Sequence, residues 1–210
     1  MAHAGGRAHG RENSLDAALG CLKYKPNLIE LDVRRSRDGV LFCYHGFPIF
    51  PFWFLAFFLR YFKYVTIRKW LKTNTLEELV LELDGKVGLF LDFKQKNIKA
   101  VEIDRVCGCS KRKVWLASFS VETLGKWRKD LGDKFFYFYN FSFFNFEKGL
   151  RKAKGLSIDG MKIFPWQARP ENIKKLRKAK VAYTIQPVLI SLRNYKKLVA
   201  KYGSFWICLD

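Results

Sequence analysis

The stretch Asn27–His45 reads NLIELDVRRSRDGVLFCYH, and it begins as an apolar strand that carries two carboxylates. Glu30 and Asp32 are two residues apart, so on a strand both side chains point to the same face. Two buried carboxylates side by side repel each other and lose hydration, which indicates that a bound cation compensates them. Their oxygen atoms are ligands that suit Mg²⁺ or Ca²⁺. The alternative is an ordinary strand whose polar end pairs with a nearby Lys or Arg.

The second half of the same stretch leads to a histidine. Asp38-Gly39 predicts a turn, and residues 40–44 read as a second extended segment that ends at His45. An imidazole gains or loses its proton near neutral pH, so it can act as a general acid or base. This short stretch therefore predicts a metal site and a titratable group close together.

The composition limits the class of protein. The chain has 210 residues, which fits one domain, and its 20 phenylalanines are enough for a large core. A formal net charge of +20 favours an anionic partner, which means a membrane surface, a nucleic acid or a phosphate-bearing substrate. The five cysteines are an odd number, and this indicates reduced thiols rather than a disulfide framework. The polar start lacks the apolar core of a signal peptide, so we expect a cytoplasmic protein.

Strand and helix patterns alternate along the chain. Strand patterns occupy a short segment at the N-terminus and residues 29–33, 87–94, 113–118, 135–141, 181–186 and 205–210, and residues 156–163 contain another short strand. Helix patterns occupy residues 15–24, 98–106, 121–131, 145–153, 171–179 and 191–202, and Ser14 is a good cap for the first. Eight strands separated by helices predict an α/β fold, a small single-domain (β/α)8 TIM barrel over residues 1–210. An open doubly wound sheet is the alternative.

A barrel places its active groups at the C-terminal ends of its strands. The polar residues at or near such ends are His3, Glu30, Asp32, His45, Asp92, Lys94 and Ser118.

One stretch departs from the alternation. Residues 46–59 read GFPIFPFWFLAFFL, without a charge, and basic residues follow as far as Lys72. The run is shorter than the roughly 20 residues that a membrane-spanning helix needs. Aromatic side chains flanked by Arg and Lys are typical of a segment at the membrane–water interface. We expect the 46–72 insertion to contact a membrane, and the alternative is a lid that packs on the barrel.

An ordered set of motifs resembles the glycerophosphodiester phosphodiesterase family, a metal-dependent group of TIM barrels. His3-Ala4-Gly5-Gly6 resembles its opening His-Arg-Gly, and Glu12-Asn13-Ser14 resembles its Glu-Asn-Thr. Residues 30–33, 38–39 and 45 resemble its Glu-Leu-Asp-Val, Asp-Gly and His-Asp. Further matches are residues 75–79 (TLEEL), 92–94 (DFK, for Glu-x-Lys), 118–119 (SF), 183–186 (YTIQ) and 210 (D).

Three positions depart from the family pattern. Ala4 stands where the family has an arginine that helps to hold the phosphate, and the candidates to replace that arginine are Arg7, Arg11 and Arg34. Asp92 replaces a glutamate ligand and is one methylene shorter. Gly46 replaces the aspartate that follows the second histidine.

The resemblance implies a role for each matching residue. Glu30, Asp32 and Asp92 would bind one divalent cation, Mg²⁺ or Ca²⁺. His3 and His45 would form the acid–base pair, and Lys94 and Tyr183 would bind the substrate.

The implied activity is metal-dependent hydrolysis of a glycerophosphodiester, or of a lysophospholipid whose acyl chain the apolar insertion accepts. The expected partner is an anionic membrane surface, which would make the protein cytoplasmic and peripheral on the membrane. The alternative is a non-catalytic barrel that binds lipid or phosphate. Nucleic acid is disfavoured because the Lys and Arg residues spread over predicted helices, as on solvated faces. The oligomeric state is left open.

Overall fold

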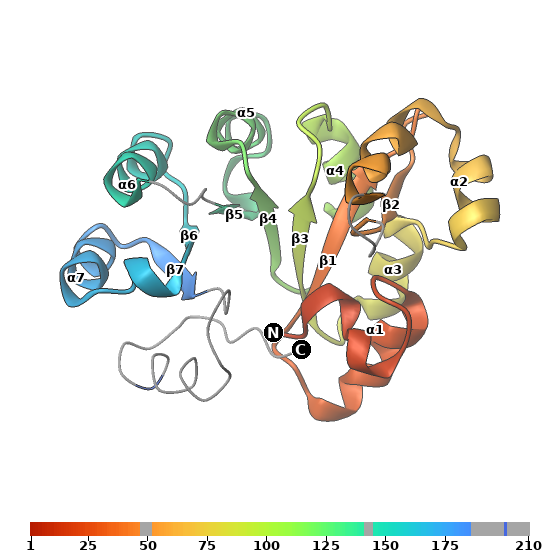
Figure 1. Cartoon of the computed structure of the whole chain (residues 1–210), viewed down its shortest axis with the longest axis horizontal. Coiled ribbons are helices and arrows are strands. Elements are labelled where there is room, and N and C mark those ends of the chain that lie inside the picture. The colour runs from red at the N-terminus through yellow and green to blue at the C-terminus, as the bar shows by residue number, and fades with distance from the viewer. Residues whose placement is uncertain (47–51, 141–144, 186–199, 201–210) are drawn as a thin grey trace. The chain divides into compact units, whose positions relative to one another are not determined.

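The computed structural model describes residues 1–46, 52–140, 145–185 and 200 (Figure 1). Strands and helices alternate along them, as the sequence predicts. The chain forms two compact units, Met1–Trp115 and Leu116–Leu209. That all 210 residues make up one domain stays a prediction.

Three strands organise the first unit. β1 (Leu28–Arg35) pairs in parallel with β3 (Gly88–Phe93) and in antiparallel with β2 (Leu41–Cys43). Ala2 forms a single parallel bridge to Ile29, so the N-terminal segment adds one rung beside the start of β1. Every residue of these strands except Arg35 is buried. Strands covered on both faces are normally apolar throughout, which is why carboxylates inside them are informative.

The helices of the first unit begin at caps that the sequence encodes. α1 (Leu15–Cys21) starts after Ser14, whose hydroxyl accepts a hydrogen bond from Ala17 N at 3.2 Å. α3 (Leu76–Leu83) starts with a reciprocal capping box between Thr75 and Glu78. The other helices of this unit are η1 (His3–Gly5), η2 (Arg7–His9), η3 (Leu22–Tyr24), η4 (Phe52–Tyr61), α2 (Tyr64–Leu71) and α4 (Ala100–Cys107).

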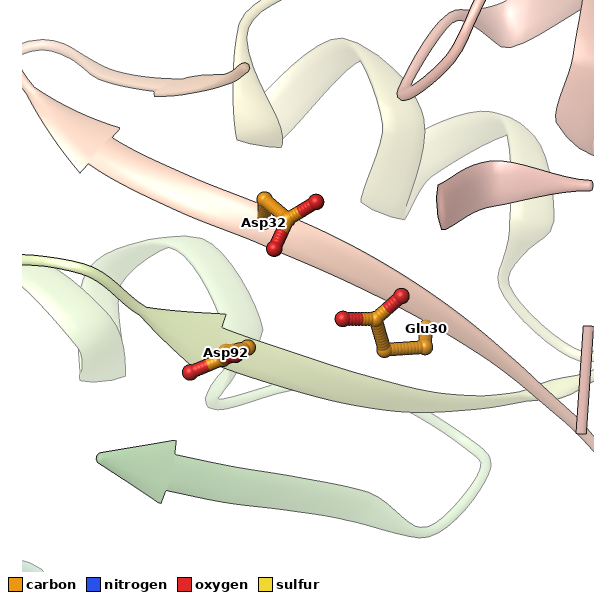
Figure 2. A group of neighbouring side chains, drawn as sticks. All are labelled: Glu30, Asp32 and Asp92. Atoms are coloured by element: carbon orange, nitrogen blue, oxygen red, sulfur yellow. The ribbon is translucent and has the colours of Figure 1, made fainter. Parts of the chain in front are cut away.

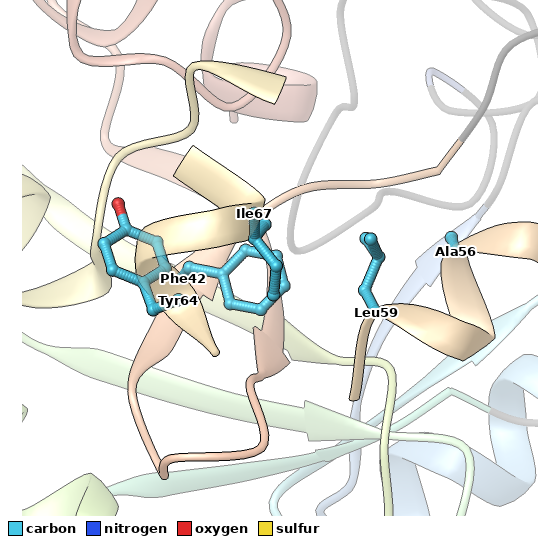
Figure 3. Packing of buried hydrophobic residues seen from close by; sticks show 5 residues of the cluster. All are labelled: Phe42, Ala56, Leu59, Tyr64 and Ile67. Atoms are coloured by element: carbon cyan, nitrogen blue, oxygen red, sulfur yellow. The ribbon is translucent and has the colours of Figure 1, made fainter. Parts of the chain in front are cut away.

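The described part of the apolar insertion folds as η4 followed by α2. Ala56 and Leu59 of η4 join a buried cluster with Phe42, Tyr64 and Ile67 (Figure 3). Other large side chains of the insertion are 39% to 71% exposed, and we call this set the aromatic patch: Phe57, Phe58, Tyr61, Phe62, Val65 and Trp70. One side of the insertion therefore packs on β2, as the lid alternative expects, while the other side faces outward.

The second unit contains a parallel sheet. β5 (Phe136–Tyr139), β6 (Gly160–Ile163) and β7 (Ala182–Ile185) pair in that order. The helices between and before them are α5 (Val121–Leu131), η5 (Gly132–Lys134), α6 (Phe146–Gly155), η6 (Pro165–Gln167) and α7 (Pro170–Lys178). β4 (Val114–Ser118) contains the boundary between the two units.

The predicted elements between residues 15 and 186 are all present, with bounds that differ by a few residues. The strand predicted at 205–210 and nearly all of the helix predicted at 191–202 lie outside the described residues. From the sequence, no helix is predicted for η4, α2 or α3. The run that forms η4 has no regular polar positions and therefore no helical period, whereas α2 and α3 each have an apolar side and a polar side. Among the described residues, no helix is both long and apolar enough to cross a bilayer.

Candidate active site

Three buried carboxylates meet on two neighbouring strands of the first unit. Asp32 of β1 and Asp92 of β3 are register partners, and Glu30 lies two residues before Asp32 on the same face of β1 (Figure 2). Their exposed fractions are 5% for Glu30, 1% for Asp32 and 2% for Asp92. One oxygen of each lies within 4.8 Å of the others, so the three predicted metal ligands are brought together.

Lys94 lies between two of these carboxylates. Its Nζ is 2.6 Å from Asp32 Oδ1 and 2.5 Å from Asp92 Oδ2. Burial acts to lower the pKa of the Lys94 ammonium, but the charges of Asp92 and Asp32 outweigh burial and raise this pKa. Lys94 therefore stays charged and neutralises part of the cluster.

The cluster carries more negative charge than Lys94 can compensate. Burial, followed by the charge of Asp32, raises the pKa of Glu30 from 4.5 to about 8. Burial also acts to raise the pKa of Asp32, but Lys94 and His45 hold it below its usual range. A set of three buried oxygen donors, one of which holds its proton for lack of a compensating charge, fits a hard divalent cation.

The N-terminal segment covers the cluster. His3 Nε2 lies 3.9 Å from Glu30 Oε2, and Ala4 N donates to the same oxygen at 2.7 Å. Ala4 adopts a left-handed φ of 48°, and Gly6 follows at 83°, where an added Cβ would lie 2.7 Å from Cys21 Cβ. This tight turn brings His3 back to the carboxylates.

Asn13 is a site residue for which the sequence predicts no role. Its Nδ2 donates to Asp32 Oδ2 at 2.9 Å, and its Oδ1 accepts from Asp32 N at 2.7 Å. It is buried and has a left-handed φ of 57°, which asparagine tolerates better than most residues. A sequence signal for this role existed, because Asn13 belongs to the Glu-Asn-Ser motif that resembles the family pattern.

His45 is exposed and lines a cavity of about 290 Å³. Glu12, Asn13 and Thr73 also contribute to its walls. Thr73 Oγ1 is buried and forms no hydrogen bond with any described residue, so a polar group in the cavity would find a partner there. Most of the wall of the cavity is apolar, and a few polar side chains interrupt it, as in many small-molecule sites.

Arg34 holds the segment that carries His45. It is buried, and it donates to Tyr44 O at 2.9 Å, to His45 O at 2.6 Å and to Ala56 O at 3.4 Å. Its planar fork joins the end of β2 to the start of the insertion. Arg11 donates to the backbone carbonyls of Leu71 and Lys72 and also lines the cavity of His45. That Arg34 or Arg11 takes the place of the family arginine stays a prediction.

Tyr183, predicted to bind substrate, is buried in β7 of the second unit. Its role stays a prediction, as do the roles of His3, His45 and Lys94.

The raised pKa of Glu30 predicts how the cation-free protein responds to pH. Between pH 4.5 and about 8 the folded state keeps a proton that the unfolded state has released, so the free energy of unfolding falls as pH rises through this window. In EDTA, we expect the melting temperature of the natural chain to fall more from pH 5 to pH 8 than that of Glu30→Gln. The difference corresponds to a few kcal/mol at most in the free energy of unfolding. Parallel curves for the two proteins would contradict this prediction.

Comparison with known proteins identifies related chains. Residues 3–102 match the model of the Glycerophosphoryl diester phosphodiesterase family. No curated protein matches the chain in sequence. The chain is similar to a glycerophosphodiester phosphodiesterase from Agrobacterium tumefaciens, at 20% identity and a TM-score of 0.76, with 100% of this chain and 94% of that chain covered. A glycerophosphodiester phosphodiesterase from Thermotoga maritima matches at 19% identity and a TM-score of 0.77, with 97% and 91% covered.

A third solved structure carries a ligand. It is a phosphodiesterase from Oleispira antarctica in complex with the product sn-glycerol-3-phosphate, and it matches at 14% identity and a TM-score of 0.78, with 99% of this chain and 90% of that chain covered. Likeness to these structures over nearly the whole chain confirms the predicted fold class, the (β/α)8 barrel.

Proposed function

We propose that the chain is a member of the Glycerophosphoryl diester phosphodiesterase family, whose model matches residues 3–102, and that it cleaves a glycerophosphodiester with the help of one divalent cation at Glu30, Asp32 and Asp92. The observation that carries this proposal is the convergence of the three buried carboxylate oxygens within 4.8 Å.

The residues of the cluster divide the work of holding a cation and a phosphate. Glu30, Asp32 and Asp92 supply the oxygen ligands, and Asn13 fixes the orientation of Asp32 by two hydrogen bonds. A bound divalent cation supplies Lewis-acid stabilisation of the charge that develops on the phosphate. Lys94 adds a permanent positive charge beside the same carboxylates.

His3 and His45 move the protons in this proposal. The nucleophile is the substrate's own glycerol 2-hydroxyl, whose proton one imidazole accepts as the oxygen attacks phosphorus. The other imidazole donates a proton to the leaving oxygen, which departs as the head-group alcohol and leaves a cyclic phosphate. Water then opens the ring, with the proton transfers reversed. The half-exposed side chain of His3 and the exposed one of His45 give both groups access to a substrate.

The aromatic patch suggests a substrate at a membrane surface. The patch lies in a segment, residues 46–72, that contains five Lys or Arg and no Asp or Glu. Arg60 covers the ring of Phe57 at 3.7 Å, so charge and aromatic surface are next to each other. We infer that this surface rests on an anionic membrane and that the enzyme accepts a lysophospholipid, the glycerophosphodiester that carries an acyl chain.

A pair of substitutions tests the membrane contact. Phe57→Ser/Phe58→Ser removes two rings that are about half exposed, so the fold should tolerate the change. We expect at least a roughly tenfold loss of binding to anionic vesicles in sedimentation, because each buried CH₂ contributes ~0.8 kcal/mol. The control is Leu81→Ser/Val101→Ser, which removes two more exposed apolar side chains, from α3 and α4. Equal vesicle binding by both variants would rule out the patch as the contact.

The substrate is tested by comparing choline release from glycerophosphocholine and from lysophosphatidylcholine in vesicles. We expect release from both, with the lysophospholipid turned over faster by the natural chain. Phe57→Ser/Phe58→Ser should slow release from the lysophospholipid and leave release from glycerophosphocholine unchanged. Equal slowing on both substrates would contradict an acyl-chain or membrane role for the patch.

A further inference from the structure

The helices α6 and α7 of the second unit carry a dense positive charge. Residues 145–180 contain eleven Lys or Arg and three Asp or Glu, a net charge of +8. A solvated helix face is the usual explanation for such a run. That explanation does not account for a hollow into which several of these side chains converge.

The hollow has a volume of about 440 Å³, within the range of small-molecule sites. Its apolar lining is Leu150 and Ala179, and one carboxylate, that of Glu147, lies at its wall. The basic residues that line it are Arg151 and Lys154 of α6 and Lys175 and Lys178 of α7.

Only one of these four cations has an acidic partner among the described residues. Lys175 pairs with Glu147. The exposed side chains of Arg151, Lys154 and Lys178 form no hydrogen bond or ion pair with any residue that the structure describes. Three like charges around one hollow repel each other, and a multivalent anion between them would turn this repulsion into attraction.

We propose that this hollow binds a small anion that carries two or more phosphate groups. The guanidinium of Arg151 can bind two oxygens of one phosphate in parallel, and Lys154 and Lys178 supply compact charges for another. Three unpaired cations exceed the charge of about −1.5 to −2 on a single phosphate monoester at pH 7. Among the described residues that line the hollow none is aromatic, so these residues offer the bases of a single-stranded nucleic acid nothing to stack on. The site is independent of hydrolysis at the carboxylates.

The test is calorimetric titration of the full chain with inositol 1,4,5-trisphosphate at physiological salt and in EDTA. EDTA leaves the carboxylates of the first unit without a cation, so phosphate cannot bind there through a metal. We expect saturable binding, and a loss of affinity of at least ~10-fold in Lys154→Gln/Lys178→Gln. The matched control is Lys126→Gln/Lys129→Gln, which removes two exposed lysines of α5 and should change the affinity less than ~2-fold.

Two results would overturn the proposal. One is the absence of saturable binding, and the other is an equal loss in both variants, which would indicate the general field of a basic protein. Vesicles of phosphatidylcholine with and without phosphatidylinositol 4,5-bisphosphate identify the source of the anion. If Lys154→Gln/Lys178→Gln loses binding to both the soluble probe and the vesicles, the site takes a lipid head group. If this variant loses binding to the soluble probe but still binds the vesicles, the site takes a free anion. The proposal stands in either case.

Discussion

Asp32→Asn is expected to remove most cation binding and most hydrolysis. Asp32 is 1% exposed and contacts Lys94 Nζ at 2.6 Å, while its other oxygen accepts a hydrogen bond from Asn13. The substitution keeps the shape but removes the charge, and the new amide must point its NH₂ at one of these two donors. Changes to residues that only support metal ligands already cost ~10–100-fold. We therefore expect a loss above ~100-fold in Mg²⁺ affinity, by calorimetry, and in turnover.

The matched control for this prediction is Asp16→Asn. Asp16 is an exposed residue in the first turn of α1, and its side chain has no partner among the described residues. Its replacement should leave cation binding and turnover unchanged. A folded Asp32→Asn protein that binds Mg²⁺ and turns over like the Asp16→Asn control would exclude Asp32 as a ligand.

His45→Gln should lower kcat by ~10²–10⁴-fold, the usual contribution of a positioned acid or base. The side chain of His45 is exposed, so the substitution should not affect folding, and KM should change little. The pH dependence of kcat should also lose one of its two limbs, which a purely structural role for this histidine would not cause.

His9→Gln is the control for His45. His9 stacks on Tyr24 with ring centroids 4.9 Å apart, and no family motif contains it. We expect the turnover and the pH profile of the His9→Gln variant to match those of the natural chain. If His45→Gln kept both limbs of the profile, His45 would not be the acid or the base.

The sequence predicts both strands that carry the three carboxylates. β1 and β3 have apolar runs that bury both faces, and the spacing of Glu30 and Asp32 is sufficient to place their side chains together. Asp92 joins them because of the register in which β3 pairs with β1. A short stretch of sequence cannot predict the register between two strands that are far apart in the chain. The motif resemblance supplied that pairing, because it assigns all three carboxylates to one ion.

The parts that sequence does not predict depend on tertiary contacts. Asn13 reaches Asp32 only because the turn at Ala4 folds the N-terminal segment back over β1. The sequence also gives no sign that Arg34 is buried and donates to the carbonyls of Tyr44 and His45. In the same way, the apolar sequence of the insertion does not predict which side chains pack inward and which form the aromatic patch.

The most direct test of the central claim is choline release from glycerophosphocholine by the purified chain, with Mg²⁺, with Ca²⁺ and with EDTA. We expect turnover that requires one of these cations, stops in EDTA and is lost in both Asp32→Asn and His45→Gln. A folded protein that binds the cation but releases no choline, from this diester or from lysophosphatidylcholine, would contradict the account. The non-catalytic phosphate-binding barrel would then be the better description, and Ala4→Arg would be the first substitution to make.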